Sequence, residues 1–351
     1  MDTKEFLKKL SNGSSVSGFE YGLSDLITSS FKDHTDQITT DKLGNIIMLK
    51  KGTEDDSSIK IMIAAHMDEI GLMVKHIEDN GFIRFTNVGG IDPRTIVGQE
   101  VVVHGKEDLF GVIGSKPPHL QEPTEIDKAI KMEDMIIDLG YPKEKVLELV
   151  SIGDPITIKR DFKSLQGSRV MGKSLDDKAG IAVMYEAMLE LSNLKHEADV
   201  YFVATVQEEV GTRGAFTSTY SINPDIGIAI DVGFGSTPEL PKGATIDMGK
   251  GPGITIGGNI HPGLRDQLIE IAKQYNIPYQ LEVTPGPTGT DGRAMQITRG
   301  GIPTLCLSVP LRYMHTSVEI IDMEDVKNTA KLLAFFISSI TRENLEGLLC
   351  Y

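Results

Sequence analysis

The ten residues Ile59-Lys-Ile-Met-Ile-Ala-Ala-His-Met-Asp68 indicate the fold class. The short apolar run over residues 59–65 is typical of a strand buried on both faces, as in a parallel sheet flanked by helices. The run ends in His66 and Asp68. Because ligands gather at the carboxyl ends of the strands in open α/β sheets, this stretch predicts a buried sheet with a polar site at its edge.

The same arrangement, an apolar run followed by polar side chains, recurs three more times. These side chains are Glu208 and Glu209 after the run 200–206, Asp231 after the run 226–230, and His315 a short loop after the run 304–309. Asp176 and Asp177 stand at the start of an expected helix over residues 177–191, where the macrodipole favours anions. All five places are expected along one edge of the sheet.

Together these places supply two imidazoles and several carboxylates. Such a donor set suits zinc, cobalt or manganese better than calcium, which prefers oxygen ligands alone. One metal ion needs about three protein ligands, so the surplus predicts two ions bridged by a carboxylate and a water. Taken singly, each residue could also have a role unrelated to metal binding, such as a surface histidine, a helix cap or a turn. The hypothesis therefore rests on their joint placement.

The sequence predicts a mixed α/β sheet flanked by helices, with a small, mainly β domain inserted into it. Residues 1–71 and 164–351 have a βα rhythm, whereas residues 72–163 alternate short strands with turn signals. Helices are expected over 17–31, 126–139, 177–191, 262–275, 292–299 and 323–339. The first is expected to open with a capping box formed by Ser17 and Glu20. The third is expected to be mostly covered, with a polar ridge at Lys178, Glu186 and Glu190.

Composition excludes several classes of protein. The 351 residues carry a formal net charge of -15, which repels nucleic acid and anionic membranes. The charged N-terminus does not resemble a secretory signal, and no apolar run reaches the length of a spanning helix, so a cytoplasmic protein is expected. Cys306 lies in an apolar run and is predicted to be a core residue.

Motifs for other chemistry are incomplete. The segment from Gly233 to Gly235 lacks the third glycine of a dinucleotide fingerprint, because position 238 is proline. The segment 249–253 lacks the ending of a phosphate loop and is interpreted as a turn. Residues 288–291 and Arg312 are candidates for the walls of a substrate pocket, although a turn and a surface cation explain them equally well.

Five ordered motifs resemble the co-catalytic metalloaminopeptidases of metallopeptidase family forty-two, which includes glutamyl aminopeptidases, FrvX-like proteins and tetrahedral (TET) aminopeptidases. These motifs are His66-Met-Asp-Glu-Ile-Gly71, Leu175-Asp-Asp-Lys-Ala-Gly180, Gln207-Glu-Glu-Val-Gly211, Ile230-Asp231 and Tyr313-Met-His315. The resemblance covers nearly the whole chain. It implies a metallopeptidase fold of the phosphorylase/hydrolase-like type, an inserted PDZ-like or barrel domain at subunit contacts, and a tetrahedral homo-dodecamer.

The resemblance also implies a role for each site residue. Asp176 would bridge two metal ions, His66 and Asp231 would complete one site, and Glu209 and His315 would complete the other. Glu208 would be the general base and Asp68 would orient His66, while Asp177 would follow Asp176 through a cis peptide. The choice between Asp176 and Asp177 as the bridge stays open at this stage.

The implied function is a dinuclear metal-dependent aminopeptidase that releases N-terminal residues from peptides with a metal-activated bridging water. The alternatives are another hydrolase on the same metal site, such as a deacylase, a carboxypeptidase or a glucanase, and a non-catalytic scaffold. His66 and His315 argue against a glucanase, which needs two carboxylates flanking a sugar, and Glu208 argues against a scaffold. Leu175 stands where acid-specific relatives often have tryptophan, so a glutamyl preference is not expected to carry over.

Overall fold

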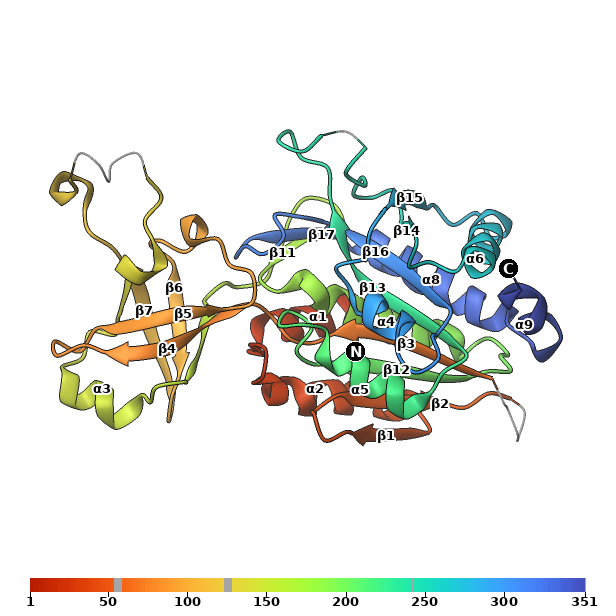
Figure 1. Cartoon of the computed structure of the whole chain (residues 1–351), viewed down its shortest axis with the longest axis horizontal. Coiled ribbons are helices and arrows are strands. Elements are labelled where there is room, and N and C mark those ends of the chain that lie inside the picture. Colours follow the sequence, from red (N-terminus) through yellow and green to blue (C-terminus); the bar gives the residue numbers. More distant parts are fainter. Residues whose placement is uncertain (54–58, 123–127, 242, 351) are drawn as a thin grey trace.

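The computed structural model describes residues 1–53, 59–122, 128–241 and 243–350. Figure 1 shows a helix-flanked sheet on one side and a smaller barrel on the other. The chain leaves the sheet after strand β3 (Lys60–His66) and returns to it at strand β10 (Lys163–Ser164). Among the described residues, no helix has both the length and the apolar content to cross a membrane.

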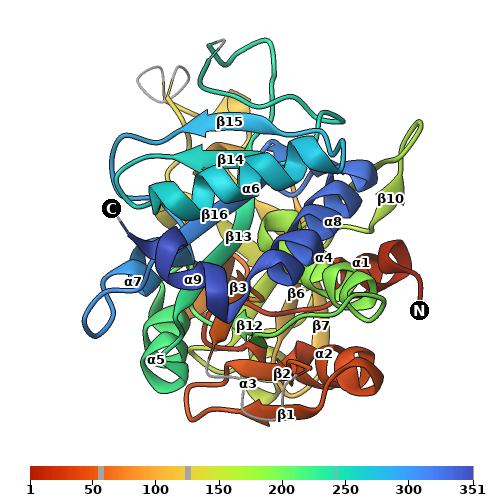
Figure 2. The same ribbon diagram turned by 90° about the vertical axis from the view of Figure 1, so that its right-hand side faces the viewer.

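A large mixed sheet forms the centre of the molecule, and its described strands run in the order β1-β2-β12-β3-β13-β16-β17-β11-β10 (Figure 2). The strands β12, β3, β13 and β16 are mutually parallel, so their carboxyl ends share one edge. The bounds are β1 (Gln37–Thr40), β2 (Ile46–Lys50), β3 (Lys60–His66), β10 (Lys163–Ser164), β11 (Arg169–Gly172), β12 (Asp199–Thr205), β13 (Ile226–Phe234), β16 (Thr304–Arg312) and β17 (Glu319–Asp322). Two further strands, β14 (Gly253–Ile256) and β15 (Gln280–Val283), extend the sheet from β16.

Helices cover both faces of this sheet. In Figure 2, α4 and α8 lie on one side and α5 and α7 on the other, in agreement with the contacts of α4 with α8 and of α5 with α7. The bounds are α1 (Thr3–Asn12), α2 (Ser24–Phe31), α4 (Leu175–Leu191), α5 (Arg213–Ile222), α6 (Pro262–Gln274), α7 (Asp291–Gln296), α8 (Met323–Ser339) and α9 (Arg342–Leu349). The helix α4 is buried along nearly its whole length, as its apolar sequence requires.

The smaller unit is a closed barrel with strand order β4-β5-β8-β7-β6-β9. Its elements are β4 (Gly71–Ile77), β5 (Ile83–Val88), β6 (Glu100–His104), β7 (Asp108–Gly114), β8 (Ile136–Asp138), α3 (Lys143–Leu149) and β9 (Pro155–Ile158). It has its own apolar core, which includes Leu72, Phe85 and Ile156. The predicted fold class, a mixed sheet flanked by helices with a small inserted barrel, is confirmed. The domain boundaries at residues 72 and 163 stay a prediction.

Two helix predictions are wrong in part. The segment 17–31 forms no capped helix at its start: a 3-10 turn, η1 (Glu20–Leu23), precedes α2. Ser17 does not cap it, because its hydroxyl donates to the buried carboxylate of Asp68. Residues 126 and 127 lie outside the described residues, while residues 128–139 form a 3-10 turn, η5 (Met132–Asp134), and strand β8 rather than a helix. There Met135 and Ile137 alternate with more exposed residues and pack in the barrel core. Burial of every second residue is the pattern of a strand and not of a helix.

The predicted polar ridge of α4 is also wrong at one position. Glu186 and Glu190 are partly exposed, but Lys178 is completely buried. Its ammonium group donates to the Ser174 hydroxyl and lies 3.4 Å from the Glu69 carboxylate, so an internal partner replaces water. Cys306 is buried, which confirms its prediction as a core residue.

Candidate metal centre

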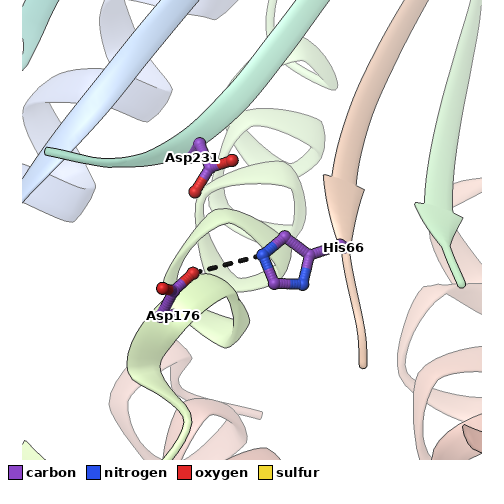
Figure 3. A group of neighbouring side chains, drawn as sticks. All are labelled: His66, Asp176 and Asp231. Atoms are coloured by element: carbon purple, nitrogen blue, oxygen red, sulfur yellow. Dashed lines mark hydrogen bonds and ion pairs between the residues drawn. The ribbon is translucent and has the colours of Figure 1, made fainter. Parts of the chain in front are cut away.

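His66, Asp176 and Asp231 form a compact group at the carboxyl edge of the parallel strands (Figure 3). His66 is the last residue of β3, Asp176 lies in the first turn of α4, and Asp231 lies within β13. One ligand atom from each of the three residues lies within 4.8 Å of the others, and all three side chains are buried. His66 Nε2 is 3.1 Å from Asp176 Oδ1.

Asp176, Glu209 and His315 form a second group that shares Asp176 with the first. His315 Nε2 lies 3.3 Å from Asp176 Oδ2 and 3.3 Å from Glu209 Oε1. The two oxygens of one carboxylate therefore face different histidines. The structure brings together all five residues that the sequence predicted as ligands.

The neighbouring residue Asp177 turns away from both groups. Its carboxylate accepts hydrogen bonds from the backbone N–H groups of Gly180 and His66, at 2.9 and 3.3 Å. The peptide bond between Asp176 and Asp177 is cis, as the resemblance implied. Asp177 therefore caps the first turn of α4, and Asp176 alone of the pair lies between the two groups.

Asp68 connects the end of β3 to the loop that carries the paired glutamates. Its buried carboxylate accepts hydrogen bonds from the Ser17 hydroxyl at 2.5 Å and from the backbone N–H groups of Glu208 and Glu209 at 3.0 and 3.2 Å. His66 Nδ1 lies 3.2 Å from the Asp68 carbonyl oxygen and 3.5 Å from its carboxylate. Asp68 therefore fixes the backbone of both glutamates as well as the ring of His66.

Two residues that hold the second group were missed by the sequence analysis. The buried Glu319 accepts hydrogen bonds from the backbone N–H groups of Asp176 and His315, at 3.2 and 2.9 Å. The carbonyl oxygen of Gly90, in the loop after barrel strand β5, lies 2.9 Å from His315 Nδ1. Neither follows an apolar run of the large sheet, so the pattern that found the ligands could not find them.

Glu208 lines a cavity of about 300 Å³ next to the two groups. Glu209 and Asp231 line the same cavity, and burial raises the pKa of Glu208 to about 9, with Asp231 adding repulsion. Thr288 and Thr290 also line this cavity, whereas Arg312 is not among its described lining residues. Of the residues predicted to line a substrate pocket, 288–291 and Arg312, only residues 288–290 therefore line this cavity.

The charge of this region favours a bound cation. Among the described residues, none of the carboxylates of Asp176, Glu208, Glu209 and Asp231 forms an ion pair with lysine or arginine. Burial raises the pKa of Asp231 well above its usual range, and hydrogen bonds to Asp176 and Glu209 raise the pKa of His315 to about 11. Buried carboxylates that repel one another need a positive partner. Mixed imidazole and carboxylate donors at two overlapping positions fit divalent ions of the zinc, cobalt or manganese kind.

The chain is similar to known aminopeptidases in sequence and in structure. Residues 44–332 match the family model of M42 glutamyl aminopeptidase. A lysyl aminopeptidase from Pyrococcus furiosus is 42% identical over 333 residues, which cover 93% of this chain and 94% of that protein. The structure of an aminopeptidase from Desulfurococcus kamchatkensis aligns with a TM-score of 0.92 at 38% identity and covers 99% of this chain and 98% of that one.

A third similar protein is the TET1 peptidase of Pyrococcus horikoshii, which can assemble into a tetrahedron or a large octahedral shell. It aligns with a TM-score of 0.85 at 36% identity, and the alignment covers 97% of this chain and all of that one. All three comparisons span the sheet, the inserted barrel and the candidate metal centre.

Proposed function

Since the chain belongs to the M42 glutamyl aminopeptidase family, we propose that it removes N-terminal residues from peptides at a centre that holds two divalent metal ions. The family establishes the enzyme class: the chain is an aminopeptidase, a hydrolase that acts on peptide bonds. The number of ions and the role of each side chain belong to the proposal.

The observation that carries the proposal is the position of Asp176 in both ligand groups. Its two carboxylate oxygens face His66 and His315, so a single side chain can serve both positions. We assign Asp231 to the ion beside His66 and Glu209 to the ion beside His315. When bound, two such ions polarise the scissile carbonyl and lower the pKa of a water between them.

We assign the role of general base to Glu208. It lines the cavity beside both groups, and its backbone is fixed by Asp68, which holds the carboxylate in place before substrate arrives. Nearby positive charge would bring its pKa down from about 9 towards the neutral range in which a general base works. Glu208 would take a proton from the attacking water and pass it to the amine of the leaving peptide.

The acidic cavity also explains why the enzyme acts at chain ends. A peptide N-terminus carries a positive charge below its pKa of about 8, whereas an internal peptide bond offers none. The described lining of the cavity has five carboxylates and no lysine or arginine, so its net charge would stay negative with two divalent ions bound and would favour the terminal ammonium group. This preference favours release of single N-terminal residues over internal cleavage.

We further propose that the chain assembles into a tetrahedral homo-dodecamer, with residues 72–163 at subunit contacts. The similar TET1 peptidase supports this. So do Phe110 and Val112, which are exposed on the outer side of barrel strand β7. Light scattering would then give about twelve times the 38.3 kDa mass of one chain, and a monomer would contradict the proposal. The cytoplasmic location stays a prediction.

The test compares two adjacent substitutions, Glu208→Gln and Glu209→Gln. Both remove one charge, but only Glu209 is a proposed ligand. Glu208→Gln is expected to lower kcat by about 10² to 10⁴ while metal content is unchanged, because general-base catalysis contributes that much. Glu209→Gln is expected to lose metal as well as activity. The measurements are hydrolysis of aminoacyl anilides by protein loaded with zinc, cobalt or manganese, and elemental analysis of the same samples.

Two results would overturn the assignment. A Glu208→Gln variant with full activity would show that Glu208 is not the general base. A fully active wild-type protein that contains fewer than two equivalents of metal would contradict the dinuclear centre. The assignment to the aminopeptidase class would still stand.

A further inference from the structure

Glu282 places a carboxylate in the wall of the catalytic cavity without belonging to either ligand group. It lies on β15 and pairs in register with Thr255 of β14. Its side chain crosses over β14 towards the centre of the sheet, where the Ser308 hydroxyl donates to Glu282 Oε2 at 2.6 Å. The carboxylate is thus held by a defined hydrogen bond inside the cavity.

Two glycines make room for this carboxylate. A Cβ atom built on Gly233 would lie 3.0 Å from Glu282 Oε1, and one built on Gly253 would lie 3.2 Å from Glu282 Oε2. A side chain at either position would crowd both this carboxylate and Ile246, so the glycines keep the space around Glu282 open.

The sheet register puts this carboxylate next to the proposed metal ligands. Ser308 of β16 is the direct neighbour of Asp231 on β13. Adjacent strands lie about 4.8 Å apart, so the hydroxyl that holds Glu282 stands one strand away from a ligand. A substrate side chain that extended from the metal centre across β16 would therefore reach Glu282.

The charge of Glu282 has no partner within the described part of the chain. The described lining of the cavity has five carboxylates, those of Asp176, Glu208, Glu209, Asp231 and Glu282, and no lysine or arginine. Two divalent ions would balance the first four charges, which leaves Glu282 as a surplus anion. Burial raises the pKa of Glu282, so its charged form is costly until a cation arrives.

The cavity lining combines the apolar side chains of Val232, Phe234 and Met314 with several hydroxyl groups. These hydroxyl groups belong to Thr255, Thr284, Thr288, Thr290 and Ser308. Hydroxyl groups can accept hydrogen bonds from an ammonium or a guanidinium group, but they offer little to a large apolar side chain. The four-carbon stem of lysine ends in a compact charge that fits a carboxylate at the far end of such a pocket.

We propose that Glu282 is a specificity-determining residue that selects peptides whose N-terminal residue has a cationic side chain, lysine or arginine. This inference rests on the proposed aminopeptidase function of the same centre. Glu282 contacts the substrate side chain and takes no part in proton transfer.

The test uses pairs of substrates that differ in charge but not in length. Lysyl anilide is compared with Nε-acetyllysyl anilide, and arginyl, leucyl and glutamyl anilides complete the set. Wild-type protein is expected to prefer lysyl over acetyllysyl anilide in kcat/KM by about 10- to 100-fold, the range of a charge-assisted hydrogen bond. Glu282→Gln, which keeps the shape of the side chain, is expected to remove that preference and leave leucyl hydrolysis within about threefold.

Two further variants separate a local effect from a general one. Asp247→Asn removes the same charge from an exposed position on the segment before β14, outside the cavity, and is expected to leave the preference intact. Glu282→Lys is expected to reverse the preference, so that glutamyl anilide becomes the better substrate. Such a gain of activity cannot arise from misfolding.

Three outcomes overturn the inference. The first is a wild-type enzyme that cleaves leucyl or glutamyl anilide better than lysyl anilide. The second is an equal loss on every substrate in Glu282→Gln, which would mean that Glu282 binds the terminal amine common to all of them. The third is a preference that survives in Glu282→Lys. A wild-type protein that cleaves no substrate with any metal would instead overturn the proposed function of the centre.

Discussion

Two clusters of buried charge lie at the start of α4, and they are built in opposite ways. In the first, which we call the lysine cluster, the buried Glu69 carboxylate lies 2.6 Å from the Lys173 ammonium and 3.4 Å from that of Lys178. In the second, the candidate metal centre, Asp176, Glu208, Glu209 and Asp231 face one another without a lysine or arginine among the described residues.

The pKa values of the two clusters follow this difference. Burial alone would raise the pKa of Glu69, but Lys173 and, to a smaller extent, Lys178 lower it to about 2, while burial lowers the pKa of Lys178 itself to about 7. At the metal centre, burial raises the pKa of Glu208 to about 9, and the nearby His66 offsets this only in part. Where a buried charge is structural, the fold supplies the counter-charge itself. Where the described residues include no lysine or arginine, a metal ion would supply the remaining positive charge, and this is the difference between the structural cluster and the proposed catalytic one.

The largest effect that tests this comparison is removal of metal. Chelation is expected to abolish aminopeptidase activity and to lower the melting temperature, since an ion at about 1,000 times its Kd contributes about 4 kcal/mol to stability. Zinc, cobalt or manganese added back should restore both. Activity assays and thermal melts before and after dialysis against a chelator measure this.

A matched control is His66→Ala, which removes a ligand of one proposed ion only; its melting temperature should fall less on chelation than that of wild type, because only the group of Asp176, Glu209 and His315 keeps all its ligands. An enzyme that keeps its activity after verified loss of all metal would show that the acidic cluster does not depend on an external cation, and the comparison would fail.

The second effect concerns the lysine cluster. Lys178→Met keeps the length of the buried side chain but removes its charge; because Glu69 keeps Lys173 as a partner, the loss should stay below the roughly 3–5 kcal/mol of a fully broken buried pair. Chemical denaturation with the metal-loaded protein should show this loss of stability. The activity per folded molecule should stay within a few-fold of wild type, because the lysine cluster is structural.

The double variant Lys178→Met with Glu69→Gln provides the control. Its loss of stability should be smaller than the sum of the two single losses, because the two residues interact. If Lys178→Met loses metal without losing stability, then Lys178 serves the metal centre, and the distinction between the two clusters disappears.

The metal centre could be predicted from the sequence, whereas the lysine cluster could not. The ligands His66, Glu209 and Asp231 follow or end apolar strands, so a rule about strand ends finds them. Lys178 was predicted on a polar ridge, because a lysine in a helix is usually solvated and only the fold brings Glu69 to it. The fold class and the central strands were predictable for the same reason, since buried parallel strands have a continuous apolar pattern.

Sequence patterns could not predict the residues that hold the metal centre through hydrogen bonds to or from the backbone. Glu319 holds the N–H groups of Asp176 and His315, and Gly90 offers its carbonyl oxygen to His315 from the inserted barrel. These contacts join segments far apart in the chain, and the barrel loop reaches the site only after the whole fold has formed. Ser17 was likewise predicted to cap a helix, but a distant carboxylate, that of Asp68, receives its hydroxyl instead.

The smallest effect is the acid sensitivity of the lysine cluster. The pKa of Glu69 falls from 4.5 to about 2 on folding, so its contribution to stability is fully present above pH 4.5 and is lost as the pH falls towards 2. A shift of this size corresponds to about 3 kcal/mol. The stability difference between wild type and Glu69→Gln should therefore shrink by about that amount between pH 5 and pH 2. Metal-free samples of both proteins make the comparison, since protonation of the ligands then affects the two equally. A difference that stays constant over this range would mean that Glu69 is not held ionised by its lysines, and the lysine cluster would no longer be the compensated counterpart of the metal centre.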